Sequence, residues 1–391
     1  MRLPPAQRRS FSLRSRALRG VLYQLIAIAL IGLAVGFLAH NTLENMRVRG
    51  IRSGFDFLLQ PAGFDIGETL MAYDSSDPYW KAFAVGVLNT LRVALIGIVL
   101  TTVIGALLGI GRFSRNALVR GLCYAYVEAF RNIPLLLQLL LWYLLLTEVL
   151  PDPGQPLSLF GAVFLSKGGL SLPAPVWAAG HAAAVFGALA GIGAAWAYAR
   201  RAQRHFDATG LPRATLLPGL GLVVLGAVIG WAAGGAPTSW RVPVAGEVAV
   251  TGGGEITPEF IAVLLGLTLY TAAFVAEVVR AGILSVPQGQ TEAANALGLP
   301  RVRLMRLIVL PQALRVIIPP MTNQYLNLTK NSSLAVAIGY PDVVSISNTA
   351  INQTGRAVEC IALIMAVYLA TSLSTSALMN AYNRRAAIRE R

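Results

Sequence analysis

The chain has 391 residues, of which 55% are hydrophobic and only 13% are charged. Soluble domains carry about 25% charged residues, so this composition excludes an ordinary soluble protein and favours a multi-pass membrane protein. The formal net charge of +14 would suit a nucleic-acid-binding protein, but the basic residues cluster at the ends of apolar segments. We therefore predict no nucleic-acid partner, and membrane lipid as the surroundings.

Eight apolar segments follow one another along the chain. Each is close to the length of about 20 residues that a helix needs to cross a membrane. Backbone groups in lipid must pair within their own segment, so we expect an all-α fold with about eight transmembrane helices. The segments are 20–39, 83–110, 132–150, 176–199, 214–233, 258–281, 315–338 and 358–381.

The first apolar segment follows a strongly basic stretch. A cleaved signal peptide also begins in this way, but here the apolar run is long and no clear small-residue cleavage site follows it. This favours a retained helix. Residues 1–82 are therefore expected to contain a basic cytoplasmic tail, the first transmembrane helix and a periplasmic loop.

The positions of the basic residues predict the orientation in the membrane. Most of the 32 Lys and Arg residues fall in alternate segments between the apolar runs, and such basic segments remain in the cytoplasm. Both termini are therefore predicted inside, with residues 83–382 as the transmembrane domain and residues 383–391 as a second basic cytoplasmic tail. Cys123 and Cys360 fall near opposite faces in this topology, too far apart for a disulfide.

Residues 176–233 differ from the other apolar segments. They are rich in Ala and Gly and nearly lack polar residues, so we interpret them as a pair of helices inserted beside the working core. Residues 150–175 on the outer side are a proline-rich loop. Residues 240–255 alternate weakly between apolar and polar positions, which predicts a short hairpin. Thr257 is expected to cap the helix that follows it.

The cytoplasmic segment 289–311 has the pattern of a docking element. Thr291 is expected to cap a short helix of small residues, and Gly298 to end that helix in a left-handed turn. Pro300 can open a second short helix, and Pro311 marks the turn toward the next span. The second helix is basic, with Arg301, Arg303 and Arg306. On composition alone, a loop that only sets topology is an equally good interpretation.

The spacing within this segment distinguishes the two interpretations. The segment resembles the signature of permease subunits of binding-protein-dependent ABC importers. That signature reads E-A-A, then three residues, G, nine residues and I-x-L-P. The matching residues are Glu292, Ala293, Ala294, Gly298, Ile308, Leu310 and Pro311. In that family this segment is the coupling helix that docks on the ATP-binding subunit, so the resemblance implies an ATPase-coupling role for these residues.

Further motifs narrow the resemblance to one branch of the family. YTAAFVAEVVRAGILSVP at 270–287, RNIP at 131–134 with Gln138, and KNSSL at 330–334 are similar to the polar amino-acid branch, which includes histidine and glutamine permeases. The extra spans, and a segment with Trp240, Pro243 and Glu259, resemble the general L-amino acid permeases of proteobacteria. The resemblance therefore implies an ABC type-1 importer core with a two-helix insertion, in a bacterial inner membrane.

The resemblance also implies partners. These are ABC ATPase subunits, a periplasmic amino-acid-binding protein and a second permease subunit, for which it favours a related chain. Lys81, Lys167 and Lys330 are followed by Ala, Gly and Asn, so none completes a Walker A motif. ATP and Mg²⁺ are thus expected to bind the partner ATPase. In this chain we expect no cofactor, no catalytic residue and no metal site, since its histidines are dispersed.

The seventh apolar segment carries an unusual polar face. Asn323, Asn327, Lys330 and Asn331 are spaced i, i+4, i+7 and i+8, so they share one side of a helix. A lysine within a membrane span costs about 2.5–3.5 kcal/mol to insert, which makes it a functional candidate. We interpret these four residues as candidates for the wall of the substrate path. The alternatives are hydrogen bonds between helices for the asparagines and a structural ion pair for Lys330.

Glu277 and Arg280 are spaced i, i+3 near the inner end of the sixth span. This spacing predicts a structural ion pair.

An ion-coupled secondary amino-acid transporter or channel is the second hypothesis for the function. Such a protein would need a coupling carboxylate or broken helices near the membrane midplane. No Asp or Glu falls deep within a predicted span, which counts against it.

Overall fold

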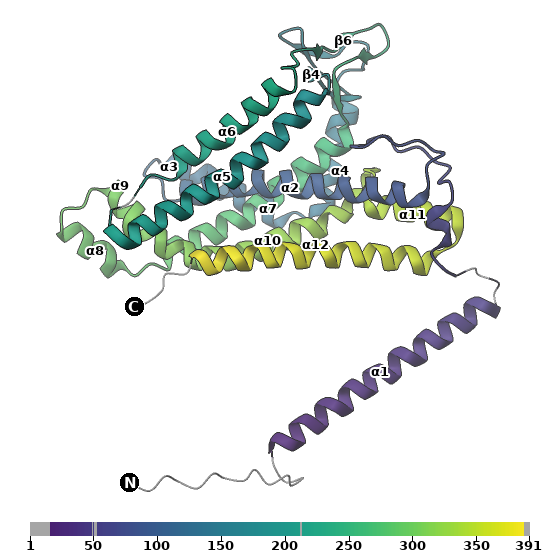
Figure 1. The fold of residues 1–391 in the computed structure, drawn as a ribbon, viewed down its shortest axis with the longest axis horizontal. Helices are drawn as coiled ribbons and strands as arrows, with labels where there is room; N and C mark the ends of the chain where they lie inside the picture. Colours follow the sequence, from purple (N-terminus) through teal and green to yellow (C-terminus); the bar gives the residue numbers. More distant parts are fainter. Residues whose placement is uncertain (1–15, 49, 51–52, 212, 387–391) are drawn as a thin grey trace. The chain divides into compact units, whose positions relative to one another are not determined.

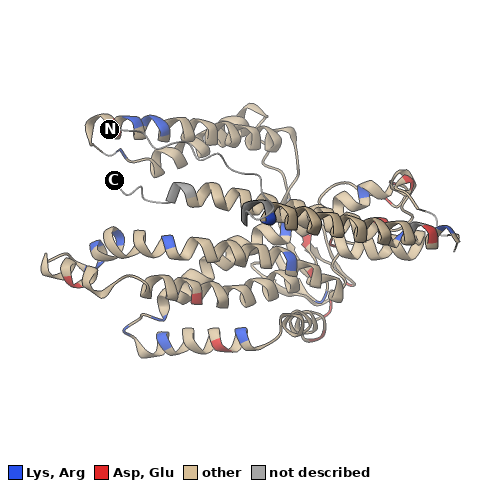
Figure 2. Cartoon of the chain, turned by 90° about the horizontal axis from the view of Figure 1, so that it is seen from below, with Lys and Arg blue, Asp and Glu red and all other residues tan. Residues whose placement is uncertain are grey.

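The computed structural model describes residues 16–48, 50, 53–211 and 213–386. Residues 1–15 of the predicted N-terminal tail and residues 387–391 of the predicted tail 383–391 lie outside the described residues, and the last helix extends through Ala386. Within the described part, seven helices are long and apolar enough to cross a membrane, or eight if one bent pair counts as a span. The prediction of about eight membrane helices is therefore confirmed. Figure 2 shows that charged residues are few along the long helices.

The seven long helices match predicted apolar segments (Figure 1). α7 begins, as predicted, directly after Thr257, whose hydroxyl accepts a hydrogen bond from the N–H of Phe260 at 3.2 Å. The long helices are α1 (Arg16–Val48), α2 (Tyr79–Gly111), α5 (Ala179–Thr209), α6 (Leu216–Ala233), α7 (Pro258–Leu284), α10 (Leu310–Asn331) and α12 (Ala357–Ala386).

The third predicted span is the exception, because it forms a bent pair with the helix before it. α3 (Ala117–Asn132) and α4 (Leu135–Leu144), which a π turn at Leu145–Val149 extends, meet at an angle of 104°. The predicted span at 132–150 corresponds to α4 with its π turn, and the bend lies at the start of this span, at Ile133 and Pro134. Proline disfavours helical geometry at the residue before it, and Ile133 is extended at φ −98° and ψ 127°. Gln138 then donates hydrogen bonds to the carbonyls of Phe130 (3.0 Å) and Ile133 (2.9 Å) that the break leaves open.

The described chain divides into two compact units. One contains Met1–Asn89 and Pro341–Ser374, and the other contains Thr90–Tyr340 and Thr375–Arg391. The first unit has a core around Phe57, Tyr79 and Phe83, contributed by the outer loop, its short 3₁₀ helix (Asp56–Leu59) and α2.

The outer loop of the first unit is fastened to the start of α12. Arg356 is buried and donates to the carbonyl of Gly54 at 2.8 Å, and its guanidinium also pairs with Asp56 at 2.9 Å. The N–H of Gly54 donates to the carboxylate of Glu359 at 2.6 Å. These charge-assisted bonds hold a loop whose only described helix is the short 3₁₀ turn at Asp56–Leu59.

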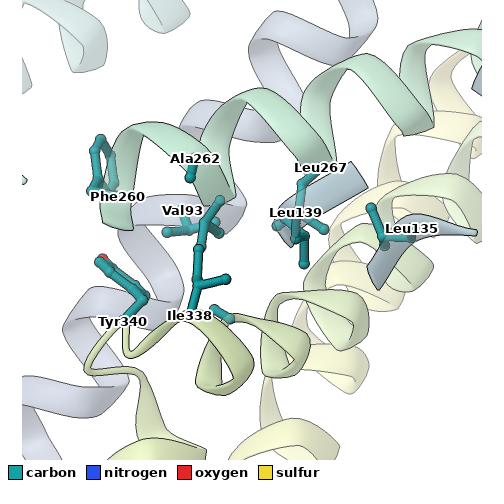
Figure 3. Packing of buried hydrophobic residues seen from close by; sticks show 10 residues of the cluster. Val93, Leu135, Leu139, Phe260, Ala262, Leu267, Ile338 and Tyr340 are labelled. Atoms are coloured by element: carbon teal, nitrogen blue, oxygen red, sulfur yellow. The ribbon is translucent and has the colours of Figure 1, made fainter. Parts of the chain in front are cut away.

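The second unit has its core where α4 and α7 meet (Figure 3). Leu135 and Leu139 of α4 pack toward Leu267 of α7. The segment after α10, a 3₁₀ helix at Ser332–Ile338, adds Ile338 and Tyr340, and α2 adds Val93. Phe260 lies under the guanidinium of Arg92 at 4.0 Å.

α5 and α6 form a closely packed antiparallel pair within this unit (Figure 1). Glycines line the contact on both helices, and a Cβ atom at Gly187 would lie 2.1 Å from the carbonyl oxygen of Gly226. Small residues allow two membrane helices to approach until their backbones touch. The two apolar helices therefore pack mainly on each other, as expected for an inserted helix hairpin.

A small antiparallel sheet joins the segments on either side of this helix pair. Its strand order is β1 (Leu157–Leu159), β2 (Val163–Ser166), β3 (Gly169–Leu172) and β8 (Gly254–Ile256). β4 (Ala174–Pro175) pairs with β5 (Trp240–Arg241), and β6 (Val244–Ala245) with β7 (Val250–Thr251). The hairpin predicted in 240–255 is confirmed as β6–β7. The fold is mainly helical, as expected. The proline-rich loop expected at 150–175 instead contains short strands, two of which pair with strands remote in sequence.

Asp342 caps α11 (Val343–Thr354) in the first unit and is completely buried. Its carboxylate accepts the N–H of Ser345 at 2.8 Å. Burial raises the pKa of this carboxyl group from its usual 3.8 to about 7, against the effect of the backbone hydrogen bonds. The folded protein therefore holds the proton more tightly than the unfolded chain does. The contribution of the protonated Asp342 to the stability of the fold is largest below pH 3.8 and is lost as the pH rises to about 7.

We expect Asp342→Asn to remove this pH dependence. The amide oxygen can still accept the Ser345 N–H, and the side chain can no longer ionise. The thermal unfolding midpoint of the variant in detergent should change less than that of the wild type between pH 3.8 and 7. Equal pH dependence of the two midpoints would show that Asp342 titrates normally in the folded protein.

Candidate functional site

The predicted docking segment consists of two short helices joined at a glycine. α8 (Gln288–Ala296) ends before Gly298, and α9 (Arg301–Leu304) starts after Pro300. The predicted cap at Thr291 was wrong, because α8 begins earlier, at Gln288 directly after Pro287. The order of a short helix, a break at Gly298 and a second short helix is as predicted.

Gly298 closes α8 in the left-handed conformation, with φ +70°. The N–H of Leu299 donates to the carbonyl of Ala294 at 3.1 Å, and the N–H of Gly298 donates to that of Asn295 at 2.9 Å. These are bonds of a glycine-terminated helix end. A Cβ atom at this position would have no neighbouring atom within 4 Å, so the backbone conformation alone requires the glycine.

The seven predicted coupling residues divide into two groups by exposure. Ala294 is buried, and it packs with Leu304 and Val309 in a small core that Ile308 joins. Glu292 and Ala293 are exposed beside Leu297, which is 79% exposed. The inward group holds the segment together, and the outward group forms a surface on which a partner can dock.

Leu310 and Pro311 form the join between this segment and α10. A π turn at Met305–Val309 precedes them, in which the N–H of Leu310 reaches the carbonyl of Met305. Pro311 lacks an N–H, and its ring disturbs a regular helical turn, so a wide turn at this point has a clear cause. The predicted change of direction at Pro311 was wrong: the helix runs on continuously from Arg301 to Ile338.

The polar part of α10 forms one wall of a pocket of about 350 Å³. Asn327 and Asn331, two of the four predicted path residues, line this pocket. Asn323 and Lys330, the other two, lie exposed on α10 outside its lining. The pocket is lined by Tyr270, Thr271 and Phe274 of α7 and by Gln324, Asn327 and Asn331 of α10.

Sequence reasoning missed the α7 wall and Gln324 as site residues. Gln324, Asn327 and Asn331 are spaced i, i+3 and i+7, which is also a helical face, rotated slightly from the predicted one. That spacing was a usable signal. The α7 residues gave no such signal, because an aromatic pair within an apolar helix is equally typical of a core.

The pocket lining is neutral and rich in hydrogen-bonding groups. Side-chain amides both donate and accept, so they can pair with a carboxylate as well as with an ammonium group. The rings of Tyr270 and Phe274 lie 4.9 Å apart, and the guanidinium of Arg131 lies 5.4 Å from the Phe274 ring. Such a site suits a small zwitterion and holds no charged lining side chain that would select one side-chain charge.

Polar side chains at the end of α10 and in the 3₁₀ helix that follows it bond to nearby backbone carbonyls. The hydroxyl of Thr329 donates to the carbonyl of Tyr325 at 2.9 Å, and that of Ser333 donates to the carbonyl of Lys330 at 2.8 Å. These residues have a local structural explanation, and we do not assign them to the path.

The predicted ion pair between Glu277 and Arg280 is present. Arg280 Nε lies 3.0 Å from Glu277 Oε1. Arg112, just beyond the end of α2, also contacts this carboxylate, with Nη1 2.5 Å from Oε2. The pair thus extends to a network of three charges that ties α2 to α7. Arg112 could not be found from local spacing, because it is remote in sequence.

Comparison with known proteins identifies the class to which this fold and site belong. Residues 101–388 match the family described as the inner membrane component of binding-protein-dependent transport systems. The chain belongs to this family, and the predicted resemblance to its permease subunits is confirmed.

Individual relatives cover nearly the whole chain. One is the general L-amino acid transport system permease protein AapQ of Rhizobium johnstonii, 45% identical over 95% of this chain and 93% of the relative. The putative amino-acid ABC transporter permease protein YhdX of Escherichia coli is 45% identical over 98% of both chains. BztB of Rhodobacter capsulatus, a glutamate/glutamine/aspartate/asparagine transport system permease protein, is 38% identical over 95% of both chains.

Proposed function

We propose that this chain is a permease subunit of an ATP-driven importer and carries polar and general L-amino acids across the bacterial inner membrane. Its relatives with these transport activities in their names support the substrate class. The chain itself performs no chemistry. ATP and Mg²⁺ bind a separate ATPase subunit that docks on the exposed face of α8 and α9, at Glu292 and Ala293.

The continuous helix between the docking segment and the pocket is the observation that carries this proposal. The run from Arg301 to Ile338 includes α9, the π turn and α10, and so joins the turn at Gly298, which follows the docking surface on α8, to Asn327 and Asn331. A movement of the docking surface is therefore transmitted through the turn at Gly298 and this helix to one wall of the pocket. Pro319 and Pro320 lie inside α10, where they weaken the helix and allow it to bend.

A second permease subunit completes the path. Asn323, Asn327 and Lys330 are exposed on a helix that crosses the membrane. Polar and charged side chains are too costly to face hydrocarbon, so this face lies against another protein or a water-filled passage. The resemblance of the whole chain favours a related chain as the partner. A periplasmic amino-acid-binding protein delivers the substrate from the outer side.

The pocket can be tested by removing its amides. In proteoliposomes that contain the whole assembly, with binding protein outside and ATP inside, Asn327→Ala combined with Asn331→Ala should lower amino-acid uptake at least about tenfold, which corresponds to about 1.4 kcal/mol. Ser333→Ala is the matched control, since among the described contacts its hydroxyl bonds only to the carbonyl of Lys330 three residues before it. Lys330→Ala should also abolish uptake while assembly stays normal.

The outcomes separate the proposal from its alternative. Normal uptake by the double variant would remove the pocket from the path, and normal uptake by Lys330→Ala would make that lysine structural. Uptake by the wild-type assembly that continues without ATP and follows an ion gradient would favour an ion-coupled secondary transporter.

A further inference from the structure

A second pocket, of about 290 Å³, lies among the inner ends of four membrane helices in the second unit. It differs from the amide pocket in its chemistry, because its lining is almost wholly apolar. α2 contributes Thr102, Ala106 and Ile110; α7 contributes Val275, Val279 and Ile283. The π turn and α10 contribute Met305, Val309, Leu310, Leu314, Ile317, Ile318, Met321 and Tyr325, and α12 contributes Met379 and Tyr382.

The floor of this pocket is buried, and its polar groups need no water molecule as a hydrogen-bond partner. Val279, Val309 and Ile317 are each less than 10% exposed. The hydroxyl of Thr102 donates to the carbonyl of Ile98 at 2.6 Å and lies 2.8 Å from that of Tyr325, so these polar groups already bond within the protein. Apolar cavities of about 150 Å³ stay dry and take up apolar molecules such as benzene. An apolar occupant therefore fits this pocket better than water or a polar solute.

The rim of the pocket is open and lies at the predicted cytoplasmic side. Ile110 is 57% exposed and Tyr382 is 56% exposed, and each lies near the predicted inner end of its helix. Met305 and Leu310 are exposed on the same rim. Ile110 and Tyr382 belong to helices that cross the membrane, and Met305 and Leu310 lie where the cytoplasmic segment leads into one, so the rim lies at the height of the inner leaflet.

An exposed arginine follows one of the rim residues in the chain. Arg306 follows the rim residue Met305 directly and is exposed. Arginines beside an apolar pocket at the cytoplasmic side attract anionic lipid headgroups. Tyr382 adds an amphipathic ring at the height where such rings accompany headgroups.

We infer that this pocket binds one acyl chain of an anionic inner-leaflet phospholipid, with the headgroup at Arg306. The chain lies between α2, α7, α10 and α12. It touches Val309 and Leu310, where the docking segment joins α10. Bound lipid thus supports the join through which the docking surface moves the amide pocket. The binding itself does not depend on which solute the protein transports.

Native mass spectrometry of the purified assembly tests this inference. The sample is delipidated stepwise and then given equal amounts of phosphatidylglycerol and phosphatidylcholine with identical chains. Wild type should retain phosphatidylglycerol. Ala106→Phe fills the pocket from α2, and Met379→Trp fills it from α12. Each variant should retain about tenfold less phosphatidylglycerol, because excluding only two methylenes of the acyl chain from the pocket has an effect of this size. Leu107→Phe is the matched control, because Leu107 is 66% exposed on the outer face of the same helix.

Arg306→Gln tests the headgroup separately and should lower the preference for phosphatidylglycerol about fivefold. Unchanged lipid retention in both filled variants would overturn the inference, and so would equal retention of the two lipids by wild type. Dissociation of the assembly by Ala106→Phe and Met379→Trp, with no lipid retained by wild type, would assign the pocket to a subunit contact and also overturn it. Thermal unfolding of each variant shows whether it is folded.

Discussion

Gly298→Val should uncouple ATP hydrolysis from transport while the protein still inserts and assembles. Gly298 has φ +70°, a conformation that a β-branched residue adopts only with strain of about 1–3 kcal/mol. No neighbouring atom obstructs the new side chain, so the effect comes from the backbone alone. The turn between α8 and α9 would shift, and the docking surface would lose its fixed relation to α10. The measurement is amino-acid uptake per ATP hydrolysed in proteoliposomes, which should fall about tenfold.

Gly298→Asn is the control for this prediction. Asparagine tolerates the left-handed conformation better than most other residues, so it should retain much of the coupling. A Gly298→Val variant with the wild-type ratio of uptake to hydrolysis would contradict the proposed role of the turn. Equal losses in the Val and Asn variants would show that the side chain, rather than the conformation, is responsible.

Gly226→Leu should separate α5 from α6 and destabilise the inserted helix pair. A Cβ atom at Gly226 would lie 2.2 Å from the carbonyl oxygen of Gly187, and a backbone atom cannot rotate aside as a side chain can. Overpacking in a close contact costs about 1–3 kcal/mol or more. The thermal unfolding midpoint of the purified protein should therefore fall clearly below that of the wild type.

Gly221→Leu provides the matched control on the same helix. Nothing lies within 4 Å of a Cβ atom at Gly221, so the same substitution there should leave the midpoint nearly unchanged. Equal midpoints for Gly226→Leu and Gly221→Leu would mean that the close contact between the helices is not needed for stability.

In the docking segment, the turn at Gly298 follows from the local sequence, whereas the burial of Ala294 and the π turn depend on tertiary packing. The left-handed turn at Gly298 was predictable, because it depends on a glycine between two short helical patterns. The division of the motif into buried Ala294 and exposed Ala293 was not, because it depends on α8 packing against the π turn. The π turn itself is a response to Pro311 within a helix that continues, whereas the proline in the sequence suggested a change of direction.

The bend at Pro134 and the amide pocket show the same contrast. Hydropathy indicated a span at 132–150 but gave no sign of the sharp bend that separates it from the helix before it. The bend follows from the proline and from a glutamine side chain that satisfies the freed carbonyls. For the pocket, polarity along α10 indicated Asn327 and Asn331. The facing wall at Tyr270 and Phe274 comes from another helix, and only packing places it opposite.

The sequence by itself determined the membrane helices, the turn at Gly298 and the pair of Glu277 with Arg280. Each of these depends on residues within one segment, where helical periodicity and turn chemistry act directly. Only the tertiary structure decided the second wall of the pocket, the contact of Arg112 with Glu277 and the glycine contact between α5 and α6. Those features join residues remote in the chain, and their partners are chosen by how the helices pack in space.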